Sequence, residues 1–572
     1  MRLRLTGLTA AKGLALGRAR IREPHVLDIE EHHLAPDQVE NEIERLHQAM
    51  AATRAELAKL RGQLQGALAQ EIGEFLDVHA MLLDDPELSS GLTTLIRTGL
   101  YSASYALKLQ HDRLAAVFEA MDDPYLRSRR EDVDHILGRV QSALHRAPDG
   151  SDVIGLAGDV LITDSVAPAE LAQLSERGVV ALLVSQGSTL SHSAIMARSL
   201  GLPMLVVAPD DLATITDGAA VMVDAGRGEI IVEPDPDDLL HLREREFAQT
   251  RERRELARLR DKPTATRDGT SIQLLANAES REDISRAHRL GAAGVGLFRT
   301  ELLFLQRHEP PDEAEQLATY RDAVMAMNGR PITLRIFDLG ADKADSAGIA
   351  LTREPNPALG LRGIRLGFSR PALLRTQLRA MLRASSYGPV RILAPMVTRR
   401  DEMVHLGQLL QSCRRELRRE GHHLPDAVPL GAMIEVPAAA IALPAMLSTL
   451  DFVSIGTNDL IQYLLAVDRG NPALGEMFSP LYPAVIRVLH QVIHTCKAAG
   501  KPVSVCGEIA SDTRFTRLLL ALGLTEFSMH PSSLLDVRAA IRDSDLRSLR
   551  RRTGALLRAG RRTTLEQLVA RL

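Results

Sequence analysis

The sequence contains no tryptophan, and aromatic residues make up only 3% of its 572 residues. A chain so poor in aromatic side chains lacks the stacking platforms that bind single-stranded nucleic acid. Its charges nearly balance, because 69 Lys and Arg residues face 73 Asp and Glu residues and leave a formal net charge of −4. The sequence therefore excludes a strongly basic field and predicts small-molecule or protein partners rather than nucleic acid.

Cysteine is also scarce, and long apolar runs are missing. The three cysteines, Cys413, Cys496 and Cys506, form no CxxC pair, which argues against a disulfide framework or a cysteine zinc site. No run of about 18 uncharged apolar residues occurs, and the first residues lack the apolar core of a signal peptide. We expect a cytoplasmic protein without membrane insertion.

The residues that are present indicate several domains, since 572 residues with 45% hydrophobic content are too many for one core. Short strands are predicted over residues 1–20. From about Ala35 to Leu144, apolar residues recur at helical spacing. We expect an all-helical insert over 33–144. Periodicity alone does not distinguish a plain helical bundle from a surface on which another protein docks.

After the insert, strand-like and helical segments alternate up to Val232. This texture predicts an α/β domain assembled discontinuously from 1–32 and 145–234. A highly charged helix follows, expected over Leu242 to Leu259. A helix with so little apolar face commonly bridges solvent, so we interpret 235–261 as a linker about which two parts of the protein swivel.

Beyond the linker, eight apolar strand-like runs alternate with helices. This pattern predicts a TIM barrel over 262–572, with a doubly wound sheet as the alternative. Polar residues favour the barrel, because they cluster at the carboxyl ends of the runs, where barrel active sites lie. The expected strands are 272–277, 294–299, 332–338, 391–396, 430–435, 452–457, 503–508 and 526–529.

One histidine, His192, lies at the expected start of a short helix behind a loop of glycine and hydroxyl residues, Gly187 to Ser191. Free backbone N–H groups and the helix dipole at such a position favour an anion. The arrangement fits a phosphoryl group carried on the imidazole. Taken alone, however, Ser-His at a helix start is more often a cap beside an ordinary histidine.

Two expected barrel strands each end in a carboxylate, at Glu435 and at Asp459. Two carboxylates on neighbouring strands form a sparse oxygen site suited to Mg²⁺, which keeps water and ligand oxygens for its remaining positions. Single strand-end carboxylates also cap helices. The pair together favours a metal.

Arginines gather near the same expected rim, and their planar guanidinium groups match phosphate and carboxylate oxygens. Unpaired charges within strands are costly, so a small anionic substrate is the expected partner of the arginines. Cys506 also follows a strand, where an acid or nucleophile and a buried apolar thiol are equally compatible with the pattern. The arginines are Arg299, Arg335, Arg362 and Arg469.

With these residues assembled, the chain closely resembles the Enzyme I family of the bacterial sugar phosphotransferase system, the phosphoenolpyruvate–protein phosphotransferases. The resemblance covers essentially the whole length. Its motifs are Ser-His-Ser-Ala-Ile-Met-Ala-Arg-Ser-Leu at 191–200, Leu-Phe-Arg-Thr-Glu at 297–301, Ile-Glu-Val-Pro-Ala-Ala at 434–439, Ser-Ile-Gly-Thr-Asn-Asp-Leu-Ile-Gln-Tyr at 454–463, Ala-Val-Asp-Arg-Gly-Asn at 466–471 and Val-Cys-Gly-Glu at 505–508.

The resemblance implies that His192 is phosphorylated by phosphoenolpyruvate and passes the group to a histidine-containing phosphocarrier protein docked on the helical insert. It also implies that Glu435 and Asp459 bind Mg²⁺, that Cys506 protonates the enolate to give pyruvate, and that the barrel forms a homodimer. The implied substrate contacts are Arg299, Arg335, Arg362, Asn458 and Arg469.

The sequence departs from the family pattern in three places. Leu190 replaces the usual Thr before Ser191-His192, Ala167 stands where Thr is common, and Ala341 replaces a glycine. Three other readings compete: a nucleotide-dependent dikinase or synthase, a nitrogen-regulatory paralogue, and a non-enzymatic phosphorelay scaffold. The first is disfavoured because no phosphate-binding nucleotide loop is evident.

Overall fold

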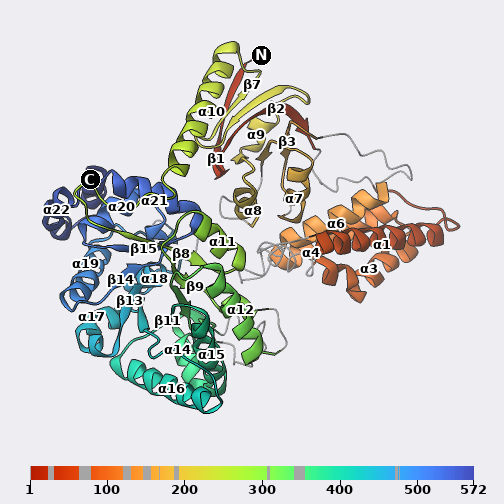
Figure 1. The fold of residues 1–572 in the computed structure, drawn as a ribbon. Coiled ribbons are helices and arrows are strands. Elements are labelled where there is room, and N and C mark those ends of the chain that lie inside the picture. Colours follow the sequence, from red (N-terminus) through yellow and green to blue (C-terminus); the bar gives the residue numbers. More distant parts are fainter. Residues whose placement is uncertain are drawn as a thin grey trace. The chain divides into compact units, whose positions relative to one another are not determined.

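The computed structural model describes residues 2–22, 31–63, 79–119, 130–145, 156–166, 168–185, 192–305, 309–340, 349, 354–469, 474–475 and 477–572. The chain forms two compact units, Met1–Thr250 and Arg251–Leu572 (Figure 1).

A closed barrel of mixed strand direction forms the centre of the first unit, with the order β1-β5-β4-β3-β2-β6-β7. Strands β2 to β5 run parallel to their neighbours in the order β2-β3-β4-β5, whereas the pairs that involve β1, β6 and β7 are antiparallel. Buried Val160, Leu183 and Val221 belong to its core. The strands are β1 Leu3–Ala11, β2 Leu14–Ile21, β3 Asp159–Thr163, β4 Ala181–Val184, β5 Met204–Val207, β6 Ala220–Asp224 and β7 Glu229–Val232. The expected α/β region is confirmed.

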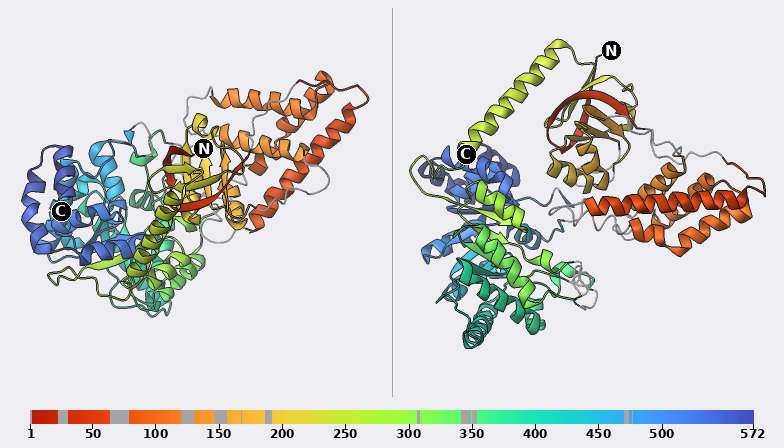
Figure 2. Two further views of the ribbon diagram at one scale, coloured as in Figure 1. Left: turned by 90° about the horizontal axis from the view of Figure 1, so that it is seen from above. Right: turned by 45° about the vertical axis from the view of Figure 1, so that its right-hand side comes forward.

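Between β2 and β3 the described chain is almost entirely helical, as the apolar spacing predicted. Helices α4 and α6, α1 and α6, and α3 and α4 pack against one another, and the red and orange helices lie side by side in both views of Figure 2. Leu46, Leu92 and Leu107 are fully buried between them. The helices are α1 Val39–Gln63, α3 Pro86–Gly99, α4 Ala103–Glu119 and α6 Arg130–His145.

Three shorter helices and one long helix complete the order of elements up to the second unit: α7 Pro168–Glu176, α8 His192–Leu200, α9 Pro209–Leu212 and α10 Pro236–Ala257. Helix α10 begins earlier than the expected Leu242. Pro236 suits the first helical position, and Asp235 and Asp238 each accept a hydrogen bond from the other's backbone N–H at the start of the helix. These caps extend the helix toward the preceding strand.

The second unit is a closed barrel of parallel strands in the order β10-β11-β12-β13-β14-β15-β8-β9. All eight predicted strands are present near their predicted positions, so the TIM barrel is confirmed and the doubly wound sheet is excluded. The strands are β8 Gln273–Ala278, β9 Val295–Phe298, β10 Ile332–Arg335, β11 Val390–Ala394, β12 Leu430–Ile434, β13 Phe452–Ile455, β14 Val503–Val505 and β15 Glu526–Met529.

Helices surround this barrel, and their apolar faces pack on the strands in one continuous buried cluster. Parallel strands place all their carboxyl ends at one rim. Among the described residues, no helix is long and apolar enough to span a membrane. The helices are α11 Arg281–Arg289, α12 Glu313–Ala326, α14 Ile364–Ser369, α15 Pro371–Ala384, α16 Arg400–Arg419, α17 Pro437–Met446, α18 Thr457–Leu465, α19 Pro483–Ala498, α20 Thr513–Ala521, α21 Leu534–Arg542, α22 Leu546–Arg558 and α23 Arg562–Ala570.

Candidate active site

A polar cavity of about 260 Å³ opens at the carboxyl ends of the barrel strands. It brings together every barrel residue that the sequence nominated for binding or chemistry. These lining residues are Arg299, Arg335, Arg362, Glu435, Asn458, Asp459, Arg469 and Cys506. Residues that lie far apart in the sequence therefore converge on a space that can hold a small anion.

The strand ends explain how these side chains reach the cavity. Arg335 is the last residue of β10, and Glu435 and Cys506 directly follow β12 and β14. Asn458 and Asp459 lie in the first turn of α18, immediately after β13. Where a strand stops pairing, its next side chains point off the barrel end rather than into its packed interior.

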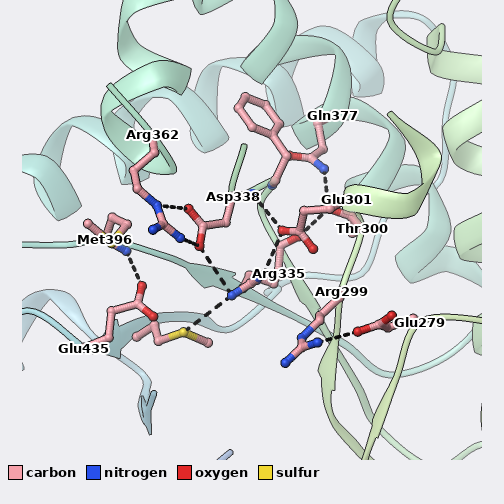
Figure 3. A network of polar contacts seen from close by, with 12 residues as sticks. Glu279, Arg299, Thr300, Glu301, Arg335, Asp338, Arg362, Gln377, Met396 and Glu435 are labelled. Atoms are coloured by element: carbon pink, nitrogen blue, oxygen red, sulfur yellow. Dashed lines mark hydrogen bonds and ion pairs between the residues drawn. The ribbon is translucent and has the colours of Figure 1, made fainter. Parts of the chain in front are cut away.

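Arg335 is almost fully buried and is held by carboxylates (Figure 3). Its Nη2 donates to Glu301 Oε1 at 2.9 Å, and its Nη1 lies 3.6 Å from Asp338 Oδ2. Burial by itself lowers the pKa of Arg335. The nearby carboxylates of Glu301 and Asp338 raise it by more, so the net shift of the pKa is upward. The guanidinium group therefore stays charged inside the site.

Arg362 is paired in the same network. Its Nε and Nη2 donate to the two oxygens of Asp338 at 3.1 and 2.7 Å, and its Nη1 donates to Tyr463 Oη at 3.4 Å. Such a bidentate pair fixes the plane of a guanidinium group. Arg362 is thus oriented before any substrate arrives.

The other two arginines are more accessible. The Arg299 side chain retains 45% exposure and pairs with Glu279, while Arg469 is exposed after the end of α18. These arginines can change partner at little cost because water screens their charges. The cavity thus combines two fixed cations with two adaptable ones.

The two proposed metal ligands differ in environment. Glu435 is 1% exposed, and its Oε1 accepts a hydrogen bond from Met396 N at 2.6 Å. Burial, and then the carboxylates of Asp338 and Asp459, raise the pKa of Glu435 to about 8. Asp459 Oδ1 is buried without a hydrogen-bond partner among the described residues.

A divalent cation fits this donor set. An orphaned carboxylate oxygen and a carboxyl group destabilised in its charged form are both features that a bound cation would relieve. Within the described part of the chain, no group of three or more His, Cys, Asp or Glu residues forms a denser metal cage. A cation here would therefore need ligand or water oxygens to complete its coordination.

Cys506 is buried at the cavity wall and belongs to a small apolar cluster with Leu297, Met433 and Phe452. Its Sγ lies 3.5 Å from the carbonyl oxygen of Ile455. Burial raises the pKa of the Cys506 thiol. Burial therefore favours the protonated thiol, which can donate a proton but is a poor nucleophile.

Asn458 is fixed by the next strand end. Its Nδ2 donates to Glu508 Oε1 at 3.1 Å, and its Oδ1 accepts from Glu508 N at 3.0 Å. Gly507 lets the chain after β14 approach the start of α18 closely, because a Cβ atom at position 507 would lie 1.8 Å from Thr457 Oγ1. This position explains the glycine of the Val-Cys-Gly-Glu motif.

His192 belongs to the first unit, where it is the first residue of α8. Helix α8 ends at Leu200, and Gly201 takes the positive φ of 67° that suits the residue after a helix. Helix α8 is held by Ser193 Oγ, which donates to Val166 O at 2.6 Å. The His192 side chain and the loop 186–191 lie outside the described residues, as do the departures at Ala167, Leu190 and Ala341.

Sequence reasoning did not nominate Glu279, Glu301 or Tyr463. Glu301 and Glu279 line the barrel cavity, and Tyr463 contacts Arg362. Glu301 and Tyr463 both lie inside quoted motifs, so a signal was present. Their roles were invisible because their partners are far away in the sequence.

Three family models match the chain. They are described as "PEP-utilising enzyme, N-terminal" at residues 6–129, "PEP-utilising enzyme, mobile domain" at 155–228 and "PEP-utilising enzyme, PEP-binding domain" at 253–546. The last of these covers the barrel strands and the cavity.

Similar proteins include "Phosphoenolpyruvate-protein phosphotransferase" of Cupriavidus necator, 42% identical over 94% of both chains. The protein of the same name from Geobacillus stearothermophilus is 36% identical over 94% of this chain and 92% of its own. A solution structure titled as Enzyme I is 27% identical, with a TM-score of 0.36, over 43% of this chain and 99% of its own. On the sequence identity and coverage of these relatives, the chain belongs to the phosphoenolpyruvate-protein phosphotransferase family.

Proposed function

We propose that this protein transfers the phosphoryl group of phosphoenolpyruvate to its own His192 and then to a histidine-containing phosphocarrier protein, with release of pyruvate, as the first step of a sugar phosphotransferase system. The observation that carries this proposal is the barrel cavity, in which fixed and adaptable arginines, two carboxylates and a protonated thiol meet. Phosphoenolpyruvate is small and carries both phosphate and carboxylate charges, so it matches this set of groups.

Arg335 and Arg362 supply fixed positive charge for the substrate, and Arg299 and Arg469 can close on it from the accessible side. Asn458 adds an amide that Glu508 already orients. Charges fixed in advance stabilise a transition state without reorganisation during the reaction. The residues of this chain therefore provide electrostatic stabilisation and positioning, which are the main requirements of phosphoryl transfer.

Glu435 and Asp459 would hold Mg²⁺. When bound, such an ion neutralises phosphate charge and orients the transferred group. The raised pKa of Glu435 and the unpaired Asp459 oxygen support this assignment. Replacing either residue with alanine should abolish labelling from phosphoenolpyruvate, whereas unchanged labelling of chelator-treated protein would exclude a metal.

The transfer balances as follows. A neutral nitrogen of His192 forms a bond to phosphorus while the bond between phosphorus and the enol oxygen breaks. The enolate then takes the proton of Cys506 Sγ on its methylene carbon and becomes pyruvate, and the thiolate left behind takes a proton from water before the next turnover. Burial keeps that proton on sulfur, which supports Cys506 as the acid.

His192 begins α8, and the free N–H groups of a helix start favour a phosphoryl group there. His192 and the cavity belong to different units, so transfer requires an arrangement of the two units that brings His192 to the cavity. We therefore propose the phosphohistidine domain at 1–32 and 145–234, the carrier-binding helical domain at 33–144, the linker at 235–261 and the phosphoenolpyruvate-binding barrel at 262–572.

Two further assignments belong to this proposal. The phosphocarrier would dock on the helical segment between β2 and β3, and two chains would form a homodimer through their barrels. Ile441, 72% exposed on α17, is an apolar side chain on the barrel surface at which such contact can be probed. Sedimentation of the intact chain and of an Ile441→Lys variant would test the dimer.

Pyruvate release from phosphoenolpyruvate, measured with and without added nucleotide, tests the proposed function. Nucleotide-independent release that requires His192 is expected. Release that depends on a nucleotide would instead favour a dikinase or synthase.

A further inference from the structure

Glu301 is a buried carboxylate in the cavity wall that has no part in the proposed binding of phosphoenolpyruvate or of Mg²⁺. It begins a short 3₁₀ turn, Glu301–Leu303, that follows β9, and it is 8% exposed. A carboxylate buried beside a site for an anionic substrate is costly and repels that substrate. We therefore expect Glu301 to make contacts in the site that offset its repulsion of the substrate.

One oxygen of Glu301 joins both ends of the segment that follows β10. Oε1 accepts from Arg335 Nη2 at 2.9 Å and from the backbone N–H of Asp338 at 2.7 Å. The two donors are three residues apart, and Figure 3 shows them meeting at the same carboxylate. Glu301 thus fixes the direction of the Arg335 side chain and the position of Asp338 together.

Asp338 extends this effect to a second arginine. Its backbone is held by Glu301, and its carboxylate holds Arg362 through the bidentate pair at 3.1 and 2.7 Å. A displaced Asp338 would carry the Arg362 guanidinium with it. Glu301 therefore controls one arginine directly and another through one intermediate residue.

The contacts of Arg335 show how each of its donors is used. Nη2 is taken by Glu301, while Nε has no hydrogen-bond partner among the described residues. Nη1 donates a weak hydrogen bond to Met433 Sδ at 3.9 Å and lies 3.6 Å from Asp338 Oδ2, which is beyond the normal length of a hydrogen bond between nitrogen and oxygen. Glu301 thus holds the Arg335 guanidinium group through Nη2, whereas Nη1 and Nε make weak hydrogen bonds or none among the described residues.

The position of strand β10, which carries Arg335, does not depend on the Glu301 carboxylate. Thr300 Oγ1 donates to the Arg335 carbonyl oxygen at 2.9 Å, and Gln377 Nε2 donates to Thr300 Oγ1 at 3.1 Å. Backbone pairing with β9 and β11 also holds β10. Removal of the Glu301 carboxylate should therefore disturb side-chain direction more than the barrel.

We propose that Glu301 is a positioning residue for phosphoenolpyruvate, because it sets the direction of Arg335 and, through Asp338, of Arg362. This role rests on the proposed function. It differs from the roles of the arginines in that Glu301 acts through them and makes no attractive contact with the anionic substrate.

The test is the rate at which labelled phosphoenolpyruvate phosphorylates the full-length chain in the presence of Mg²⁺, measured over a range of substrate concentrations. Glu301→Leu removes both hydrogen bonds and should raise the half-saturating concentration about 10- to 100-fold. Glu301→Gln keeps an oxygen and the size but loses the charge, and it should raise this concentration only about 3- to 10-fold.

Glu402 provides a matched control. It is 9% exposed and accepts hydrogen bonds from Thr398 N and Arg399 N, but it does not line the cavity. Glu402→Leu and Glu402→Gln should leave the half-saturating concentration within about 2-fold of wild type. A purely structural loss would lower the amount of labelled protein without changing this concentration.

A second measurement separates action through Arg335 from an independent effect. The Glu301→Gln substitution should have a smaller effect in an Arg335→Met background than in wild type, because one of its two targets is then missing. This comparison uses the glutamine variant, so it remains decisive if Glu301→Leu does not fold.

Equal effects of Glu301→Gln in both backgrounds would overturn the positioning role. So would half-saturating concentrations of the Glu301 variants that match those of the Glu402 controls. A wild-type chain that takes no phosphoryl group from phosphoenolpyruvate would instead refute the proposed function.

Discussion

Removing the charge of Glu435 should abolish a pH-dependent loss of stability in the metal-free protein. Burial, with Asp338 and Asp459 nearby, raises the pKa of Glu435 from 4.5 to about 8 in the folded chain. Between pH 4.5 and about 8, Glu435 therefore keeps its proton in the folded protein but has lost it in the unfolded protein. The stability from this proton is fully present below pH 4.5 and is lost as pH rises through about 8.

The size of the effect follows from the shift. One pKa unit corresponds to about 1.36 kcal/mol, so the interval from pH 6 to pH 8 should cost about 2.3 kcal/mol, because half of the folded molecules have already lost the proton at pH 8. For a domain of this size, this loss would lower Tm by about 5 °C. A bound divalent cation replaces the proton, so stabilisation by added Mg²⁺ should grow over the same interval.

Scanning calorimetry of the intact chain with a chelator and with Mg²⁺, at pH 6 and pH 8.5, measures both effects. Glu435→Gln should flatten the pH dependence and remove the response to Mg²⁺. Glu402→Gln, at a buried position outside the cavity, should retain the wild-type behaviour. The reasoning is refuted if Glu435→Gln and wild type lose the same Tm between the two pH values.

Three further outcomes are expected. Cys506→Ala should slow pyruvate formation with little change in phosphoenolpyruvate affinity measured by calorimetry, and equal loss of both would indicate a packing role. Gly507→Ala should lower affinity and Tm together, because its Cβ would lie 1.8 Å from Thr457 Oγ1, and unchanged values of both would show that the turn adjusts freely. A fragment of residues 1–260 should exchange phosphate with a phosphorylated carrier but not with phosphoenolpyruvate, and little activity should return when fragment 262–572 is added untethered.

Much of the barrel could be predicted because its signals are local. Each apolar run is a strand buried by the helices around it, and parallel strands bring their carboxyl ends together whatever lies between them. Arg335, Glu435 and Cys506 could therefore be placed on one rim from sequence alone. The start of α10 at Pro236 was missed because a Pro-Asp segment resembles a turn and also suits the first turn of a helix.

The pairing inside the site could not be predicted. Glu301 meets Arg335 across 34 positions of sequence, and Met396, from the loop after β11, donates its N–H to Glu435. Such contacts depend on which strands become neighbours and on side-chain direction, and neither leaves a periodic pattern. Arg335 is buried and Arg469 is exposed for the same reason, because the burial of each side chain depends on which segments become its neighbours.

The most direct test of the central claim is the site of phosphorylation. The intact chain should be incubated with phosphoenolpyruvate and Mg²⁺ and then mapped by mass spectrometry under conditions that preserve acid-labile phosphate. An acid-labile, base-stable phosphoryl group on His192, absent from His192→Ala, is the predicted result. A label on another residue, or continued labelling of His192→Ala, would contradict the account.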